Sequence, residues 1–261
     1  MIIAADIGNT NIKFGVFDGS EDKMCCRFQI SSSAVRTCDE YILLIKSFIR
    51  EQSVDGAFTG SVISSVVPSL TVPVSDAFSK ITGRKPFIIG SGTKTGFPIN
   101  IDVQSELGSD IVSNVSAALS KFSAPLAVVD MGTATTIAAV NSNGVLTGAV
   151  IAPGCGISLA ALSENAALLF DVNAVRPKDI LGKNSAESIC SGIYYGTVFM
   201  IDGFIREIRS KLCSHDNMKL SLVATGGNSD ILDSCRNKFC KDPDLTLKGA
   251  ARLYYKNVTA D

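Results

Sequence analysis

The sequence contains no tryptophan and only one histidine, His215, in 261 residues. One imidazole does not supply the two or three histidine ligands that many zinc sites use. The eight cysteines are scattered and form no Cys-x-x-Cys pair, which also removes the usual spacing of a zinc ribbon. A structural zinc site and histidine-based catalysis are therefore not expected. Because His215 lies in the polar run SHDN, we predict that it is an exposed loop residue, and we interpret the cysteines as reduced cytoplasmic thiols.

The chain also lacks an excess of either charge and lacks a long apolar run. Its 24 Lys and Arg and 25 Asp and Glu give a formal net charge of −1, so nothing favours nucleic acid or an anionic membrane. The apolar N-terminus carries no basic residue and is interrupted by Asp6, unlike a signal peptide. The longest apolar stretch, residues 193–205, is too short to span a bilayer and contains Asp202. We predict a cytoplasmic protein that binds neither nucleic acid nor membrane.

What the sequence does contain is a distinctive first strand and turn, MIIAADIGNTNIKFGVF at residues 1–17. An apolar strand runs into Asp6, and a turn of Gly8, Asn9 and Thr10 leads to a second apolar strand. A carboxylate at the end of a buried strand is costly unless a cation or a hydrogen-bond donor meets it. The small residues, hydroxyls and backbone N–H groups of the turn suit phosphate oxygens. The alternative is a tight β-hairpin whose Asp and Asn serve only the turn.

The same pattern recurs near the middle of the chain, which favours the functional interpretation. Residues 126–140 read LAVVDMGTATTIAAV, with Asp130, Gly132 and Thr133 in the same relation to a preceding apolar strand. Each copy consists of a strand, an Asp, a Gly, a residue with a hydroxyl group and a second strand. This repetition indicates two similar α/β halves that face each other. Phosphate groups would be held in a nucleotide cleft between the halves.

The rest of the chain supports an α/β protein of two domains, 1–122 and 123–261. Thr37 and Glu40 fit a capping box before a helix with a clear apolar face. Helical spacing predicts further helices at residues 72–81, 110–122, 157–169 and 185–212, and a last helix after DPDLTLKGAARLYY. Apolar runs predict strands at 57–67, 87–89, 148–152 and 220–224.

Three glycines, Gly192, Gly196 and Gly203, lie inside the predicted helix of residues 185–212. Each costs roughly 1 kcal/mol in a helix interior relative to alanine. A closely crossing helix would explain them, from within the chain or from a partner subunit.

The loop GSGTKTG at residues 90–96 does not have the spacing of a Walker phosphate loop, because Thr93 and not glycine precedes Lys94. Lys94 is either a phosphate contact or a solvated charge.

Asp110 is the most informative carboxylate outside the two turns. It follows Gly108 and Ser109 and opens a predicted helix. Asp is a preferred residue at a helix N-terminus, where the helix dipole stabilises it. It could equally be a general base that accepts a proton from an attacking hydroxyl. The sequence leaves both roles open.

Taken in order, the motifs of the chain resemble those of one family, the type III pantothenate kinases. They are DIGNTNIKFGVF at 6–17, SSVVP at 64–68, KTG at 94–96, ELGSD at 106–110, DMGTATT at 130–136, GAVIAPG at 148–154, SGIYYG at 191–196, ATGG at 224–227 and DPDLTLKGA at 242–250. The family belongs to the superfamily that contains acetate kinase, the sugar kinases and actin. The resemblance implies two ribonuclease-H-like domains of the actin-like ATPase type and ATP-dependent phosphorylation of pantothenate, the first step of coenzyme A biosynthesis. It also implies a cytoplasmic homodimer that uses Mg²⁺ and a monovalent cation, K⁺ or NH₄⁺.

The resemblance also assigns roles by position. Asp110 falls on the proton acceptor and Asp130 on the monovalent-cation ligand, while Asp6 is a further metal-binding candidate near the phosphates. The ATP-binding positions are Asp6, Gly8, Asn9, Thr10, Asn11, Lys13 and Thr133. The pantothenate-binding positions are Gly108, Ser109, Ile111 and Ser185.

The departures from the family pattern all lie on the pantothenate side. Where the family has Tyr-Asp-Asn-Pro-Arg-Glu-Val-Gly-Ala-Asp-Arg, residues 101–111 read IDVQSELGSDI. Ile101 replaces the Tyr, and Ile111 replaces the Arg whose planar fork could bind a carboxylate. Two alternatives follow from this difference. The chain could be a kinase of the same fold for another small hydroxy acid, or a non-catalytic subunit that needs a related partner chain in a hetero-oligomer.

Overall fold

The computed structural model of the chain describes residues 1–165, 176–213 and 219–258. His215 and the end of the helix predicted over residues 157–169 lie outside these ranges. The chain forms two compact units, the first made of residues 1–121 together with 244–258 and the second of residues 122–243.

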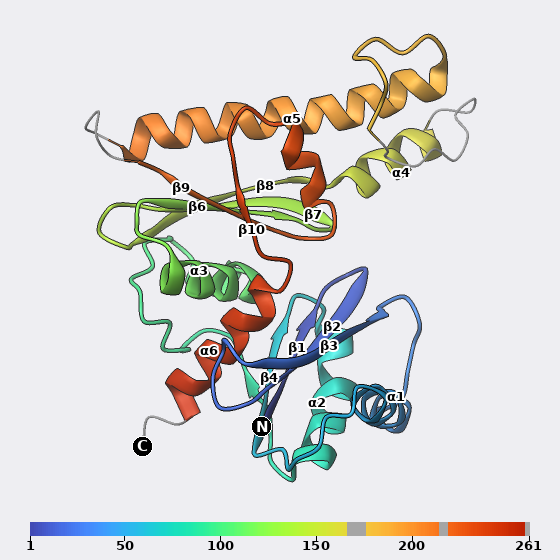
Figure 1. The fold of residues 1–261 in the computed structure, drawn as a ribbon, viewed down its shortest axis with the longest axis vertical. Helices are drawn as coiled ribbons and strands as arrows, with labels where there is room; N and C mark the ends of the chain where they lie inside the picture. The colour runs from blue at the N-terminus through green and yellow to red at the C-terminus, as the bar shows by residue number, and fades with distance from the viewer. Residues whose placement is uncertain (166–175, 214–218, 259–261) are drawn as a thin grey trace. The chain divides into compact units, whose positions relative to one another are not determined.

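The first unit contains a five-stranded sheet in the order β3-β2-β1-β4-β5 (Figure 1). Its strands are β1 (Ile2–Ile7), β2 (Asn11–Phe17), β3 (Met24–Ser31), β4 (Gly60–Ser65) and β5 (Phe87–Ile88). The first three strands pair antiparallel, whereas β4 and β5 run parallel to β1. The carboxyl ends of β1 and β4 therefore lie at the same edge of the sheet. The sequence analysis did not predict β3, whose residues are only partly buried.

Helices cover both faces of this sheet. They are α1 (Cys38–Glu51), α2 (Pro68–Thr82), α3 (Ser109–Lys121) and α6 (Leu245–Val258), with a short 3₁₀ turn at Gln104–Glu106. The helices α1 and α2 bury their apolar sides against one face, and α6 packs against the other, with α3 beside it. The predicted capping box is confirmed, because the backbone N–H of Glu40 donates to Thr37 Oγ1 while the Glu40 carboxylate accepts the N–H of Thr37. The helix α2 starts at Pro68, where a missing N–H costs nothing.

The last helix, α6, packs with the first unit, although the sequence-based division placed residues 123–261 in the second. Leu247, Ala250 and Leu253 are buried in the same cluster as Ile2 and Ala4 of β1. Sequence order suggested a cut at the midpoint of the chain, but the apolar side of α6 is buried by β1, β4 and α3.

Ion pairs hold the same helix to the first unit. Arg252 pairs with Glu21 at 2.6 Å, and Arg27 pairs with Asp244 at 2.6 Å. Asp244 immediately precedes α6 and only 14% of its side chain is exposed, so this pair fixes the point where the chain enters the helix.

The second unit repeats the same topology in the order β10-β9-β6-β7-β8. Its elements are β6 (Leu126–Met131), β7 (Ala134–Val140), β8 (Leu146–Pro153), α4 (Cys155–Asn165), α5 (Ser185–Leu212), β9 (Ser221–Thr225), a 3₁₀ turn at Ser229–Ser234 and β10 (Cys240–Lys241). As in the first unit, three antiparallel strands are followed by parallel ones. The predicted pair of ribonuclease-H-like α/β units is therefore confirmed.

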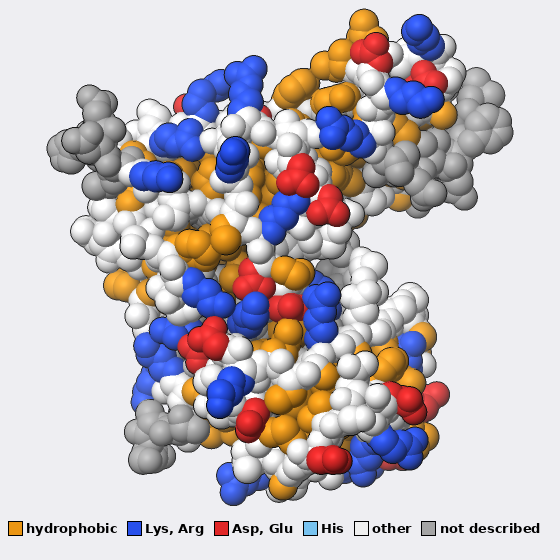
Figure 2. All heavy atoms as spheres, in the orientation of Figure 1, with side chains coloured by type: hydrophobic (Ala, Val, Ile, Leu, Met, Phe, Trp, Pro, Cys, Tyr) orange, Lys and Arg blue, Asp and Glu red, His pale blue; other side chains and the backbone are white. Residues whose placement is uncertain are grey.

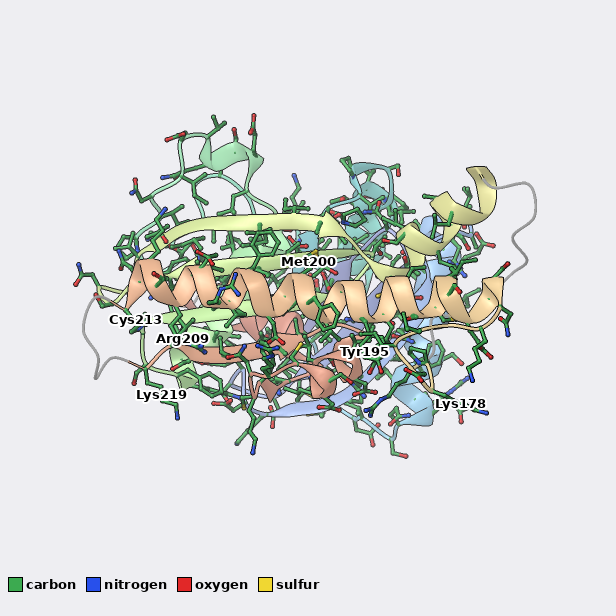
Figure 3. All side chains as sticks on the ribbon, turned by 90° about the horizontal axis from the view of Figure 1, so that it is seen from above. Lys178, Tyr195, Met200, Arg209, Cys213 and Lys219 are labelled. Carbon is green, nitrogen blue, oxygen red and sulfur yellow. The ribbon has the colours of Figure 1, made fainter. Side chains whose placement is uncertain are left out.

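The helix α5 is long and apolar enough to cross a membrane by length and composition alone. In the structure it lies along one face of the second sheet (Figure 3). Its residues Ile193, Val198, Ile201 and Ile205 are buried in the core that includes Val129 of β6. It is therefore a core helix of the second unit, and its range agrees with the helix predicted from the sequence.

Candidate active site

The turn after β1 has the tight geometry that the sequence predicted. The N–H of Gly8 donates to the carbonyl of Asn11 at 3.1 Å, and Ser32 Oγ donates to the carbonyl of Gly8 at 2.6 Å. A side chain at Gly8 would lie 3.2 Å from the Asn11 carbonyl oxygen, so the turn has little room for one. Asn9 and Thr10 are exposed at its tip. The turn therefore presents polar groups at the carboxyl end of β1.

Asp6 lies directly before this turn and shares one face of the sheet with two other polar residues. It pairs with Lys13 across the antiparallel ladder and with Ser64 across the parallel one. Residues that lie opposite each other in a ladder point to the same face. That face is the one covered by α6 and α3, because Ile2 and Ala4 alternate with Asp6 and contact them. A carboxylate, an amine and a hydroxyl therefore meet at one corner of the sheet.

Asp110 lies in the first turn of α3. Its Oδ1 accepts the N–H of Ile111 at 2.8 Å, while the first turn closes through the N–H of Val112 and the carbonyl of Gly108 at 3.2 Å. A Cβ atom at Gly108 would overlap Asp110 Oδ1, so the glycine makes room for the carboxylate. Burial raises the pKa of Asp110, and the backbone N–H groups of Ile111 and Asp110 offset only part of that shift. Asp110 is thus a helix-terminal carboxylate whose basicity is higher than usual.

Ser109 links Asp110 to the strand next to Asp6. Its buried Oγ accepts the N–H of Ser65 at 2.8 Å, donates to the carbonyl of Ser65 at 3.0 Å and lies 3.1 Å from Ser64 Oγ. Ser64 is the ladder neighbour of Asp6. The structure therefore brings Asp6, Lys13 and Asp110 to the same edge of the first sheet. The hydroxyl of Ser109, predicted to contact the substrate, is used in these internal hydrogen bonds.

The second unit repeats the arrangement around Asp130, which pairs with Thr136 and with Thr225. Gly226 has a φ of +93°, and a Cβ atom there would lie 2.6 Å from Asp130 Oδ1. The glycine is required by this positive φ and because a Cβ atom would also lie 2.5 Å from the backbone of Met131. Thr225 Oγ1 is buried and has no hydrogen-bond partner among the residues that the structure describes. A carboxylate and an unsatisfied hydroxyl on one face are oxygen ligands that suit a small cation.

Thr133 lies in the turn between β6 and β7, and its carbonyl accepts the N–H of Gly154 at 3.1 Å. The sequence analysis listed Thr225 and Gly226 only within the motif ATGG and did not pair them with Asp130. It listed Ser64 only within the motif SSVVP and assigned it no role. The signal that could have found them is the Ser or Thr at the end of the parallel strand in each half.

Of two other predicted residues, Ser185 belongs to the second unit and Lys94 to the first. Ser185 is exposed at the start of α5, after Asn184, whose Oδ1 caps the helix by accepting the N–H of Glu187 at 2.9 Å. The exposed Lys94 is tied through its backbone to Asn257 near the end of α6. That end of α6 lies at the start of β4, where Tyr254 packs on Gly60, and so away from the Asp6 turn. The position favours the solvated interpretation of Lys94.

Ile111 follows Asp110 in the first turn of α3 and is only 5% exposed. Because isoleucine carries no positive charge, this position cannot form an ion pair with the carboxylate of a substrate.

The acidic residues suit a metal that binds together with phosphates. Within the described ranges no three His, Cys, Asp or Glu side chains form a metal cluster. Mg²⁺ commonly takes one or two carboxylates and completes its shell with water and phosphate oxygens. Asp6 alone, beside a turn that offers backbone N–H groups, fits that mode of binding.

Two ribonuclease-H-like units with an Asp-Gly-hydroxyl turn in each define an actin-like ATPase or sugar kinase fold. The chain belongs to the type III pantothenate kinase family, whose model matches residues 2–207. It is 37% identical over 262 residues to the type III pantothenate kinase of Moorella thermoacetica, covering 99% of this chain and 100% of that one. It is 38% identical to the enzyme of that name from Bifidobacterium animalis subsp. lactis, covering 99% and 100%.

Among solved structures, a ROK family glucokinase from Streptomyces griseus, in complex with glucose and AMPPNP, superposes with a TM-score of 0.53. The two are 13% identical, and the match covers 97% of this chain and 98% of that one. At this identity the likeness concerns the fold alone. Membership of the family makes the chain an ATP-dependent kinase that transfers phosphate to a hydroxyl group.

Proposed function

We propose that this chain phosphorylates pantothenate with ATP, the first step of coenzyme A biosynthesis, in the cytoplasm. The observation that carries the proposal is Asp110, a carboxylate of raised pKa held at the same sheet edge as the Asp6 turn. The proposal is further supported by the names of the relatives.

In this mechanism Asp110 accepts the proton of the pantothenate hydroxyl as that oxygen attacks. A carboxylate with a raised pKa is the better base, provided that it is ionised at the working pH. Gly8, Asn9, Thr10 and Asn11 bind phosphate oxygens through the turn, Lys13 supplies a positive charge, and Thr133 is a further ATP contact. ATP with Mg²⁺ supplies the phosphoryl group and neutralises its charge. The protein contributes mainly positioning and electrostatics.

Asp6→Asn is expected to weaken binding of ATP–Mg²⁺ without unfolding the first unit. The amide keeps the size of the side chain but removes the charge that would hold the metal. Calorimetric titration of ATP with and without Mg²⁺ would measure the change. Asp18→Asn, an exposed change beyond the other end of β2, is the matched control. Equal ATP–Mg²⁺ affinity for wild type and Asp6→Asn would remove Asp6 from the metal site.

We further propose that Asp130 and the unsatisfied Thr225 hydroxyl hold the monovalent cation, K⁺ or NH₄⁺. Replacing K⁺ by tetramethylammonium at constant ionic strength should lower the rate of phosphorylation markedly, because a bulky cation cannot fit a carboxylate and a hydroxyl on adjacent strands. Steady-state assays in the two salts, with NH₄⁺ as the restoring control, make the comparison. An unchanged rate would leave Asp130 with a phosphate or structural role.

On the acceptor side, Gly108, Ser109, Ile111 and Ser185 are the proposed contacts, and Ile111 supports a second candidate function. A buried isoleucine cannot pair with the carboxylate of pantothenate as an arginine would. This favours, as the alternative, a kinase of the same fold for another small hydroxy acid, or a subunit that acts with a related partner chain.

We also propose a homodimer that forms through α5. Gly192, Gly196 and Gly203 lie on one side of this helix, and a Cβ atom at any of them would meet no atom within 4 Å. Among the described residues, Ser158 and Leu162 of α4 line a cavity with Gly192 and Gly196, but no other helix reaches the Cβ positions of these glycines. Phe199 lies on the same side, is 56% exposed and stacks on Tyr195, with ring centroids 6.1 Å apart. Small residues beside an exposed aromatic ring suit close packing against a second copy of the helix.

Phe199→Asp is expected to convert the dimer to a monomer, because it places a charge at the centre of this apolar side. Size-exclusion chromatography with light scattering would report the mass. Leu43→Asp is the matched control, since Leu43 is an exposed apolar residue of α1 in the other unit. A wild-type monomer, or a dimer that persists in Phe199→Asp, would contradict the assignment. A stable complex only with a related chain would favour the hetero-oligomer.

A further inference from the structure

A cavity of about 420 Å³ lies on the second unit, beside the side of α5 that carries Phe199 and Gly203. It is lined by three arginines, one aspartate, one asparagine and an apolar wall of α5, namely Arg206, Arg209, Arg236, Asp202, Asn237, Phe199 and Gly203. In Figure 2 basic side chains gather over the C-terminal half of α5, and Figure 3 shows Arg209 on that half. None of these residues belongs to the candidate active site.

The carboxylate in this cavity is already satisfied by the loop that follows the 3₁₀ turn. Asp202 accepts the backbone N–H of Arg236 at 3.0 and 3.2 Å and the side-chain amide of Asn237 at 2.8 Å. It therefore fixes the loop against α5. Its oxygens accept hydrogen bonds from neutral donors, and no guanidinium within the described ranges pairs with them.

Asn237 in turn orients one arginine. Its Oδ1 accepts a hydrogen bond from the Arg209 guanidinium at 2.7 Å. A neutral amide thus holds Arg209 in place without neutralising it, and the remaining N–H donors of the fork are available. Holding a long side chain in advance lowers the entropy that a ligand must overcome.

The balance of charge in the cavity is positive. Among the residues that the structure describes, neither Arg209 nor Arg236 has a carboxylate partner, and Arg206 pairs only with its exposed neighbour Glu207 at 3.0 Å. Three guanidinium groups against the carboxylates of Asp202 and Glu207 leave an excess of one positive charge. Like charges gathered around one hollow repel each other unless an anion is bound.

We propose that this cavity is a binding site for a small ligand that carries a diphosphate group. A guanidinium group binds phosphate with two parallel hydrogen bonds. Two adjacent phosphates offer enough acceptor oxygens for more than one arginine. The volume lies at the small end of the range for ligand pockets.

Calorimetric titration of the full-length protein with inorganic pyrophosphate, without Mg²⁺ and at fixed ionic strength, tests the proposal. Three proteins are compared: wild type, Arg209→Gln/Arg236→Gln, and the control Lys46→Gln/Arg50→Gln. The control removes two exposed positive charges from α1 in the other unit. Any pyrophosphate bound at the turn of Asp6 is common to all three proteins and does not affect the comparison.

Wild type and the control should share a saturable binding event that is at least about tenfold weaker in Arg209→Gln/Arg236→Gln, since charge-assisted hydrogen bonds are lost. Sulfate should bind the wild type at least about tenfold more weakly than pyrophosphate does, because it offers one group and not two. Equal binding by wild type and Arg209→Gln/Arg236→Gln, or an equal loss in the control, would overturn the site. Equal binding of sulfate and pyrophosphate would overturn the ligand class.

Discussion

Asp110→Asn is expected to reduce kcat for pantothenate phosphorylation by roughly 10²- to 10⁴-fold, the usual contribution of a general base. Asparagine keeps the shape of the side chain and caps a helix about as well as aspartate does, but it cannot accept the proton. The Oδ1 atom that accepts the Ile111 N–H can be retained by the amide. The substitution therefore separates the two roles that the sequence left open. Steady-state kinetics and a thermal melt on the same preparations measure both.

The pH dependence gives a second measure of the same group. Because burial raises the pKa of Asp110, the base is protonated and inactive at low pH, and kcat/KM should rise as pH increases through that raised pKa. The midpoint of the acid limb should therefore lie at a pH above the ordinary pKa of aspartate. The profile of Asp110→Asn should lack this acid limb. If Asp110→Asn retains both its activity and its melting temperature, Asp110 is a helix-terminal residue only.

Gly249→Ala is expected to destabilise the protein by about 3 kcal/mol, at the upper end of the range for overpacking. Gly249 lies inside α6, and a Cβ atom there would overlap the backbone of Ser113 in α3. Because the opposing atoms are backbone, the two helices must move apart. That movement would expose the shared core of Leu247, Ala250 and Val112. Denaturant unfolding of the variant would measure the loss.

Gly156→Ala is the matched control for this substitution. Gly156 also lies in a helix, α4, but a Cβ atom there would meet nothing within 4 Å. Alanine is the better helix former, so the free energy of unfolding should stay the same or rise by up to about 1 kcal/mol. A loss for Gly249→Ala no larger than the change for Gly156→Ala would show that α3 and α6 do not meet as closely as described.

The architecture could be predicted from local patterns because most elements are specified by their own residues. The duplicated α/β fold was predicted from the two Asp turns. Its main helices were predicted from the capping box at Thr37 and from the spacing of apolar residues in α5. The membership of α6 could not be predicted in this way. Its burial against β1 and α3 depends on contacts between residues more than 120 positions apart, and hydrophobic periodicity does not reveal which core a helix joins.

The candidate site was predictable residue by residue but not as an arrangement. Asp6, Asp110 and Asp130 follow from motifs, whereas the hydrogen bonds of Ser109 with Ser64 and Ser65 do not. The role of Gly108 was hidden for the same reason, because it depends on the direction of the Asp110 side chain. Strand register is needed before Ser64 and Thr225 can be recognised as neighbours of the two carboxylates.

The most direct test of the central claim is a product analysis with purified protein, ATP, Mg²⁺, K⁺ and pantothenate. Formation of ADP should depend on pantothenate, and mass spectrometry should find pantothenate with one added phosphoryl group, equal in amount to the ADP formed. Parallel reactions with other small hydroxy acids should be much slower. Phosphorylation of another hydroxy acid but not of pantothenate, or no transfer to any acceptor, would contradict the assignment of this chain as a pantothenate kinase that acts on its own.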